Sequence, residues 1–216
     1  MREASAVPSR VRSWPVVGWT VAMPWILTPP YAATNRLDWP EAVVIPMTGI
    51  DRSVPFAPQW AGVYLALFPF MWLAVLRQPD GRHAAGTVAA FAVALAIACT
   101  VFLIVPTSYP HRPAADGWMA LIAGLDTVRN ACPSLHGAYA VLAAWALVAA
   151  SAGSGAGRRA MIGCGAAAMA AAILWATLSV RQHGVIDLGA GMALGVAVAL
   201  AGQRWWWPAR RAAEMA

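Results

Sequence analysis

The stretch "ACPSLHGAYAVLAAWALVAA", residues 131–150, places a short polar cluster directly before a continuous apolar run. The apolar part approaches the ~20 residues that a helix needs to cross ~30 Å of hydrocarbon. The whole chain has this character, since 60% of its 216 residues are hydrophobic and 11% are charged, whereas a soluble domain is about a quarter charged. These features predict an all-α polytopic membrane protein with one domain over residues 1–216.

Six apolar segments predict a bundle of six transmembrane helices. They are residues 13–31, 58–77, 84–106, 135–151, 160–180 and 186–203. The first resembles a signal peptide, but we expect it to be retained, because its removal would leave an odd number of helices. The longest connections, 32–57 and 107–133, fall on the same side of this arrangement, and we expect a short interfacial helix in the first of them.

The arginines predict the orientation of the bundle, because all 15 basic residues are arginine. With the N-terminus in the cytoplasm, ten arginines lie inside and five outside, as the positive-inside rule requires. We therefore expect cytoplasmic termini, an extracytoplasmic site and a location in a bacterial plasma membrane. The net charge of +6 forms no basic stripe with interleaved aromatic residues, so no nucleic-acid partner is predicted.

Four polar features converge at the outer ends of the last four helices, which predicts a catalytic core built from those helices. They are "PTSYPHRP" (106–113), "RNACPSLH" (129–136), "SVRQH" (179–183) and Asp187. Ser134 is placed to cap a helix whose first turn contains Leu135, His136 and Gly137. The free N–H groups and the helix dipole there suit an anion, and Gly137 would let a ligand approach the backbone. Simple helix capping is the alternative interpretation.

His183 and Asp187 are four residues apart and therefore face the same side of a helix. A carboxylate there accepts the Nδ1–H of the imidazole and leaves Nε2 nucleophilic. Arg112 and Arg181 supply guanidinium groups that bind phosphate oxygens bidentately. This set predicts phosphoryl transfer through a phosphohistidine at His183, with His136 as general acid and base.

Three further residues are candidates for the phosphate site, namely Arg129, Asn130 and His111. For each of them, a role in capping or on the loop surface is the alternative. The sequence contains no carboxylate cluster suited to magnesium and no metal-binding cysteine spacing. We therefore predict no metal and no cofactor.

The chain resembles the type 2 phosphatidic acid phosphatase superfamily, whose motifs are K-x6-R-P, P-S-G-H and S-R-x5-H-x3-D. The corresponding stretches here are Arg112-Pro113, Pro133-Ser134-Leu135-His136 and His183-x3-Asp187. Their order and the six-helix layout also match. The resemblance implies a metal-independent membrane enzyme with an extracytoplasmic active site, acting on a lipid phosphate or diphosphate.

The departures from the motifs are at specific positions. Val105 stands where the family has lysine, Thr177 where it has arginine, and Leu135 where it has glycine. Arg181 is a candidate replacement for the missing arginine. The P-S-L-H form, together with "IDRSVPFAPQW" (50–60), resembles the inositol-phosphorylceramide-synthase-like branch, which includes phosphotransferases. The resemblance thus implies a lipid-phosphate phosphohydrolase or a transferase that moves a phospho-headgroup to an alcohol.

Two other classes of protein remain open from the residues alone. His136 and His183 could be axial ligands of a b-type haem on two helices, although both lie at helix starts among arginines. A transporter usually has its polar residues near mid-bilayer, whereas here they lie at one end. The sequence leaves the oligomeric state and the identity of the lipid open.

Overall fold

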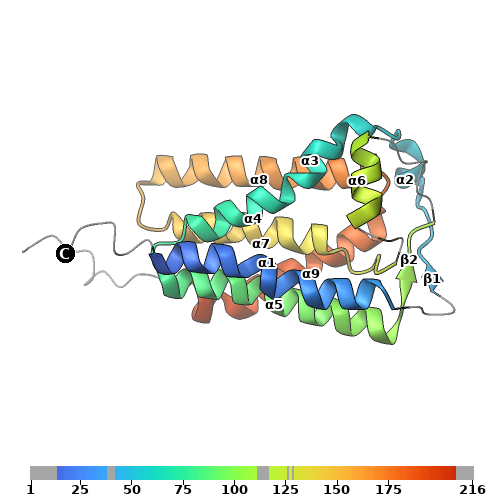
Figure 1. Ribbon diagram of the computed structural model, residues 1–216. Helices are drawn as coiled ribbons and strands as arrows, with labels where there is room; N and C mark the ends of the chain where they lie inside the picture. The colour runs from blue at the N-terminus through green and yellow to red at the C-terminus, as the bar shows by residue number, and fades with distance from the viewer. Residues whose placement is uncertain (1–13, 38–41, 111–116, 126, 128, 208–216) are drawn as a thin grey trace, which may run out of the picture.

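The computed structural model describes residues 14–37, 42–110, 117–125, 127 and 129–207, and it is mostly helical (Figure 1). The long helices are α1 (Trp14–Asn35), α4 (Leu67–Leu76), α5 (Gly81–Ile104), α7 (Leu135–Ala150), α8 (Ala156–Ser179) and α9 (Val185–Trp206). The short elements are β1 (Val43–Val44), α2 (Gly49–Ser53), η1 (Pro58–Trp60), α3 (Ala61–Leu65), β2 (Thr107–Ser108) and α6 (Gly117–Leu125).

A helix occupies each of the six predicted segments, with η1, α3 and α4 following one another in the second. Within the described part of the chain, four of these segments are long and apolar enough to cross a membrane, namely Pro58–Leu76, α5, α8 and α9. The apolar helix α7 has 16 residues. The 22-residue α1 falls outside this set because its prolines, threonines and tryptophans make it less apolar. The structure therefore confirms the prediction of a mostly helical protein with apolar helices long enough to cross a membrane.

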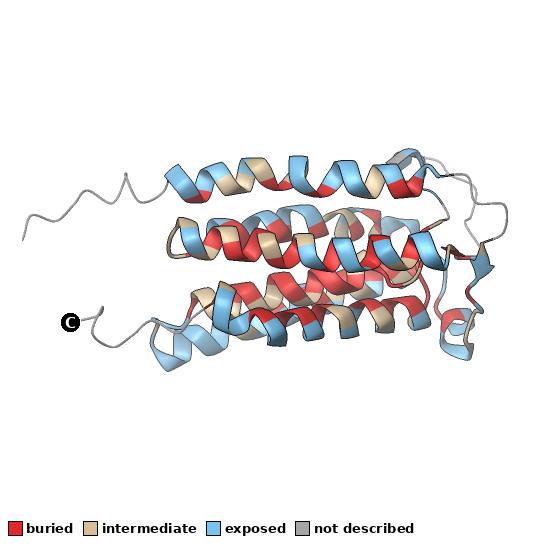
Figure 2. Ribbon diagram, turned by 90° about the horizontal axis from the view of Figure 1, so that it is seen from below, coloured by how far each residue is buried: buried red, intermediate tan, exposed pale blue. Residues whose placement is uncertain are grey.

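Helix α7 lies at the centre of the bundle, in contact with α4, α5, α8 and α9, while α1 packs against α5 and α4. Phe91, Leu142 and Ile173 are fully buried in the core between these helices. Buried residues face inward and exposed residues face outward along each helix (Figure 2). The outward face contains large apolar side chains such as Trp25 and Ile104, as a surface in contact with lipid requires.

The elements β1, β2, α2 and α6 gather at one end of the bundle, opposite the end where α1 begins and α9 finishes (Figure 1). They come from the two long connections of the sequence. Strands β1 and β2 pair in parallel, with Val43 opposite Thr107 and Val44 opposite Ser108. Helix α2 lies in the connection for which a short helix was predicted. The strands were not predicted, because two residues are too few to show an alternating pattern.

Candidate active site

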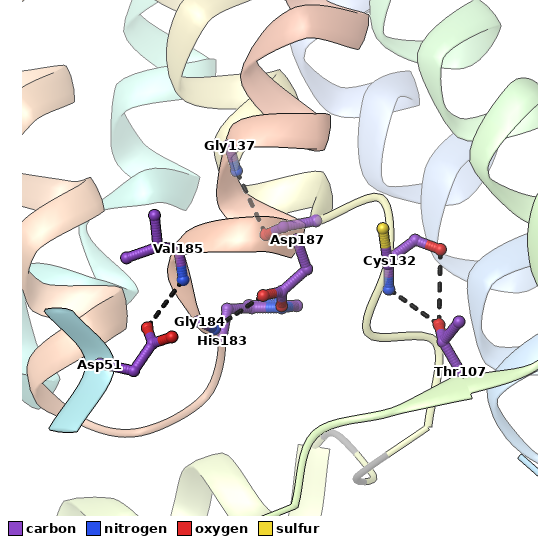
Figure 3. Close-up of polar contacts among 9 residues, drawn as sticks. Asp51, Thr107, Cys132, Gly137, His183, Gly184, Val185 and Asp187 are labelled. Carbon is purple, nitrogen blue, oxygen red and sulfur yellow. Dashed lines mark hydrogen bonds and ion pairs between the residues drawn. The ribbon is translucent and has the colours of Figure 1, made fainter. Parts of the chain in front are cut away.

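The start of α9 fixes the imidazole of His183. Nδ1 of His183 lies 2.5 Å from Oδ2 of Asp187, and Oδ1 of Asp187 accepts a hydrogen bond of 2.8 Å from the N–H of Gly184 (Figure 3). The Asp187 side chain is fully buried. Asp187 therefore satisfies a free amide at the helix start and orients the ring of His183, which is the contact that the spacing predicted.

His136, in the first turn of α7, lies beside this pair. The ring centroids of His136 and His183 are 5.8 Å apart and their planes are inclined by 49°. The two helix starts are tied by a hydrogen bond of 3.0 Å from the N–H of Ser134 to the carbonyl of Asp187. Nε2 of His136 is buried and has no hydrogen-bond partner among the described residues. The structure thus brings together the two histidines that the sequence places on separate helices.

Tyr64, on α3, belongs to this group although sequence reasoning missed it. Its ring stacks on the ring of His136, with centroids 4.2 Å apart and planes inclined by 19°. The Tyr64 side chain is buried, so the stacking limits the orientations available to the imidazole. Nothing in the sequence around Tyr64 distinguishes it from the other aromatic residues of an apolar helix.

The start of α7 is capped as predicted, since Oγ of Ser134 accepts a hydrogen bond of 3.4 Å from the N–H of Gly137. The role predicted for Gly137 is different. A Cβ at Gly137 would lie 2.7 Å from the carbonyl oxygen of Leu188, so the missing side chain admits the backbone of α9 and not a ligand. Leu135 lines the cavity described below.

We expect Gly191→Ala to destabilise the protein, because its Cβ would lie 2.0 Å from the carbonyl oxygen of Ser134. Overpacking of this kind costs about 1–3 kcal/mol. Gly189→Ala is the matched control on the same helix, since its Cβ would meet nothing within 4 Å. Thermal unfolding in detergent compares the two variants, and equal unfolding temperatures would contradict the close contact between α7 and α9.

Asp51, from the first long connection, anchors the start of α9 from the other side. Its Oδ2 accepts hydrogen bonds from the N–H and the hydroxyl of Thr48, at 2.6 and 2.7 Å. Its Oδ1 accepts one of 2.8 Å from the N–H of Val185 (Figure 3). The side chain is 2% exposed. Asp51 was missed as a site residue, and the signal available was its place in the stretch 50–60 on which the family resemblance rests.

Asp51→Ala should lower the free energy of unfolding by about 1–3 kcal/mol, because the partly buried N–H of Val185 then loses its carboxylate acceptor. Thr48→Ala removes the cap of the short helix α2 and the hydroxyl bond to Oδ2 of Asp51, at a cost of about 1 kcal/mol. It serves as the control, because it leaves the bond from the N–H of Val185 to Oδ1 of Asp51 in place. Chemical denaturation of both purified variants measures the difference. Equal losses would show that the bond from Asp51 to α9 adds nothing to stability.

Arg181 and Tyr109 lie next to Asp51. Burial raises the pKa of Tyr109, and the Asp51 carboxylate raises it further, while Arg181 opposes them. Arg181 has a left-handed backbone, with φ of 58°, and its Nη2 donates a hydrogen bond of 2.7 Å to the carbonyl of Val54. Its Nε is buried without a partner among the described residues. The structure places Arg181 beside Asp51 and shows no hydrogen bond from its described side chain to either histidine.

The remaining predicted site residues divide into three groups. Asn130 is buried, donates from Nδ2 to Oγ1 of Thr34 at 3.3 Å, and lines the same cavity as the histidines. Nη1 of Arg129 instead donates to the carbonyl of Leu37 at 2.5 Å, at the rim of the bundle. His111 and Arg112 lie outside the described residues.

Two of the three positions that depart from the family motifs stand where the family has a charged residue, and they add no charge to the site. The hydroxyl of Thr177 is buried and donates to the carbonyl of Ile173 within α8, at 2.7 Å. Val105 is exposed at the end of α5. Across the described ranges, no group of three or more His, Cys, Asp or Glu side chains is placed to hold a metal ion.

A cavity of about 550 Å³ opens beside the histidines and runs between α1, α3, α4 and α7. His136, His183 and Asn130 form its polar end. Its walls are apolar and include Leu27, Leu67, Met71 and Trp72. The cavity joins one polar site to a hydrocarbon-like pocket of a size that holds one small ligand.

Comparisons of the chain with protein-family models, with curated proteins and with solved structures found no match.

Proposed function

We propose that the protein is an integral membrane lipid-phosphate phosphohydrolase that acts through a phosphohistidine. The observation that supports this most is the pair of imidazoles 5.8 Å apart, with Asp187 on Nδ1 of His183, at the polar end of an apolar cavity. A carboxylate that orients a histidine nucleophile and a second histidine in reach of the same atom are the parts that phosphoryl transfer needs.

In the first step, Nε2 of His183 attacks phosphorus and forms an N–P bond, while the bond from phosphorus to the lipid oxygen breaks. His136, in its protonated form, gives a proton to that oxygen, and a lipid alcohol leaves. The Asp187 carboxylate stabilises the positive charge that develops on His183 and keeps its ring in place.

In the second step, His136 takes a proton from water, whose oxygen attacks phosphorus. The N–P bond breaks, and inorganic phosphate and free His183 are the products. In this proposal, negative charge on the phosphoryl oxygens is met by the first N–H groups of α7 and by Arg181, whose Nε has no partner among the described residues. Arg112 is a further donor that the sequence alone predicts. Donors fixed before the reaction in this way stabilise the transition state.

The lining of the cavity supports a lipid as substrate. A soluble phosphate ester would leave the apolar walls around Leu67 and Met71 in contact with water. A hydrocarbon chain buries this surface, which contributes about 25 cal/mol for each Å² removed from water. The substrate class is therefore a phosphate or diphosphate ester of an apolar alcohol.

In this proposal all six long helical segments cross the membrane, and α1 and α7 do so in contact with helices of the four candidate spans. Arg77, Arg158 and Arg204 belong to the end of the bundle away from the histidines. The positive-inside rule then places that end and both termini in the cytoplasm of a bacterial cell. The histidines face the extracytoplasmic side.

A panel of lipid phosphates and diphosphates, incubated with the purified protein in mixed micelles, tests the proposal. Mass spectrometry should detect inorganic phosphate and the free lipid alcohol without added metal. Candidate alcohols are added in parallel, and a new phosphodiester in place of free phosphate would assign a transferase. Absence of any turnover across the panel would contradict a phosphoryl-transfer enzyme.

A further inference from the structure

A second apolar groove, of about 810 Å³, lies between α7, α8 and α9 and reaches the end of the bundle away from the histidines. Its walls include Trp145 and Val148 of α7, Gly163 and Leu174 of α8, and Met192 of α9. None of the residues that the mechanism uses lines this groove. It is therefore separate from the candidate active site.

The groove exists because α8 stands apart from α9. Helix α8 packs along α7 and against α3, but the structure shows little contact between α8 and α9. Among the four candidate spans of the described chain, α8 is the least buried. Gly163, Ala167 and Ala171 lie four residues apart on the wall of the groove, and their small size leaves the space unfilled.

The length of the groove fits a hydrocarbon chain of one leaflet. Arg159 and Leu174 both line it on α8, and a helical rise of 1.5 Å per residue separates them by about 22 Å. One leaflet measures about 20–22 Å from the headgroups to the middle of the bilayer, of which about 15 Å is hydrocarbon. The groove thus runs from the level of the headgroups to the middle of the membrane.

The charges at the mouth of the groove favour an anion. The Arg159 side chain has no hydrogen-bond or ion-pair partner among the described residues. His83, also at the mouth, is tied through Nδ1 to the carboxylate of Asp80 at 2.9 Å. The other lining residues are uncharged. A free guanidinium at the end of an apolar groove between membrane helices is the arrangement that binds anionic lipid headgroups.

We propose that this groove binds one anionic phospholipid, with an acyl chain between α8 and α9 and its phosphate at Arg159. The chain takes the place of the side-chain packing that α8 and α9 lack. Bound lipid therefore holds α8 in position, and the site is a structural one that stands independently of the activity proposed above.

The test compares phosphatidylglycerol with phosphatidylcholine, each added to the delipidated full-length protein in detergent. Native mass spectrometry counts bound lipid, and thermal unfolding measures stabilisation. We expect one retained phosphatidylglycerol and a higher unfolding temperature than with phosphatidylcholine. Arg159→Gln should abolish the preference for the anionic lipid, whereas Arg82→Gln, which removes an arginine near the same end but outside the groove, should keep it.

A second pair of variants tests the place of the chain. Gly163→Leu fills the groove, because a Cβ there meets only Val148 at an ordinary distance of 3.8 Å. Gly165→Leu adds the same side chain on another face of α8, where nothing lies within 4 Å. We expect Gly163→Leu to lose the retained lipid and Gly165→Leu to keep it. Ala167→Leu, on the same wall of the groove, replaces Gly163→Leu if that variant does not fold.

Three results would overturn the proposal. They are an equal response of the wild-type protein to the two lipids, an equal loss of lipid in the two glycine variants, and a wild-type dimer that Gly163→Leu converts to a monomer. The last result would assign the groove to a second copy of the chain. Because the readouts are binding and unfolding, none of these outcomes bears on phosphate release at His183.

Discussion

Replacing His183 with asparagine is expected to lower phosphate release from a lipid phosphate by about 10⁴-fold or more, because the nucleophile is lost. Asparagine is preferred to alanine here, since its amide can still donate to the buried Oδ2 of Asp187. The fold is thereby kept while Nε2 is removed. Inorganic phosphate released from the best substrate of the panel is the measurement.

Covalent trapping separates this result from a general loss of structure. The wild-type protein, quenched during turnover with substrate labelled in the phosphate, should carry an acid-labile label, and His183→Asn should carry none. Gly189→Ala, which changes α9 where nothing lies within 4 Å, should be labelled as the wild type is. Turnover or labelling in a folded His183→Asn variant would contradict the assignment of the nucleophile.

Much of the fold could be predicted from the sequence because membrane helices are specified by local composition. Each of the six predicted segments is helical, and the predicted start at residue 135 and end at 180 lie within one residue of the structure. The pairing of β1 with β2 could not be predicted, because it joins two connections distant in sequence through two residues each. Contacts of that kind depend on how the helices bring the connections together.

In the site, too, contacts between residues close in the sequence could be predicted, whereas contacts between separate elements could not. The contact of His183 with Asp187 follows from helical spacing alone. The stacking of Tyr64 on His136 and the bond from Asp51 to Val185 join separate elements, and neither residue type by itself indicates them. For Gly137 the sequence allows two interpretations, since a glycine in a first helical turn can make room for a ligand or for a neighbouring helix. The packing of α7 against α9 shows that its missing side chain makes room for the backbone of α9.

His136→Ala is expected to lower the release of phosphate from a lipid phosphate by about 10²–10⁴-fold, the range for loss of a general acid and base. The variant should remain folded, because Nε2 of His136 has no hydrogen-bond partner among the described residues and its removal leaves no polar group newly unpaired there. Its effect should differ in kind from that of His183→Asn. The difference appears when the leaving group no longer needs a proton.

An aryl phosphate that carries an alkyl chain provides this condition, since its phenolate leaves without protonation. With His136→Ala, the first step should then proceed at a rate close to that of the wild type and release a burst of one phenolate per active site. The second step should remain slow, because water has lost its base, and phosphate should accumulate on His183. The close approach of the two rings, with centroids 5.8 Å apart, is what allows one histidine to serve both steps. A loss equally large with both substrates, or a burst in His183→Asn, would contradict the separate roles assigned to the two histidines.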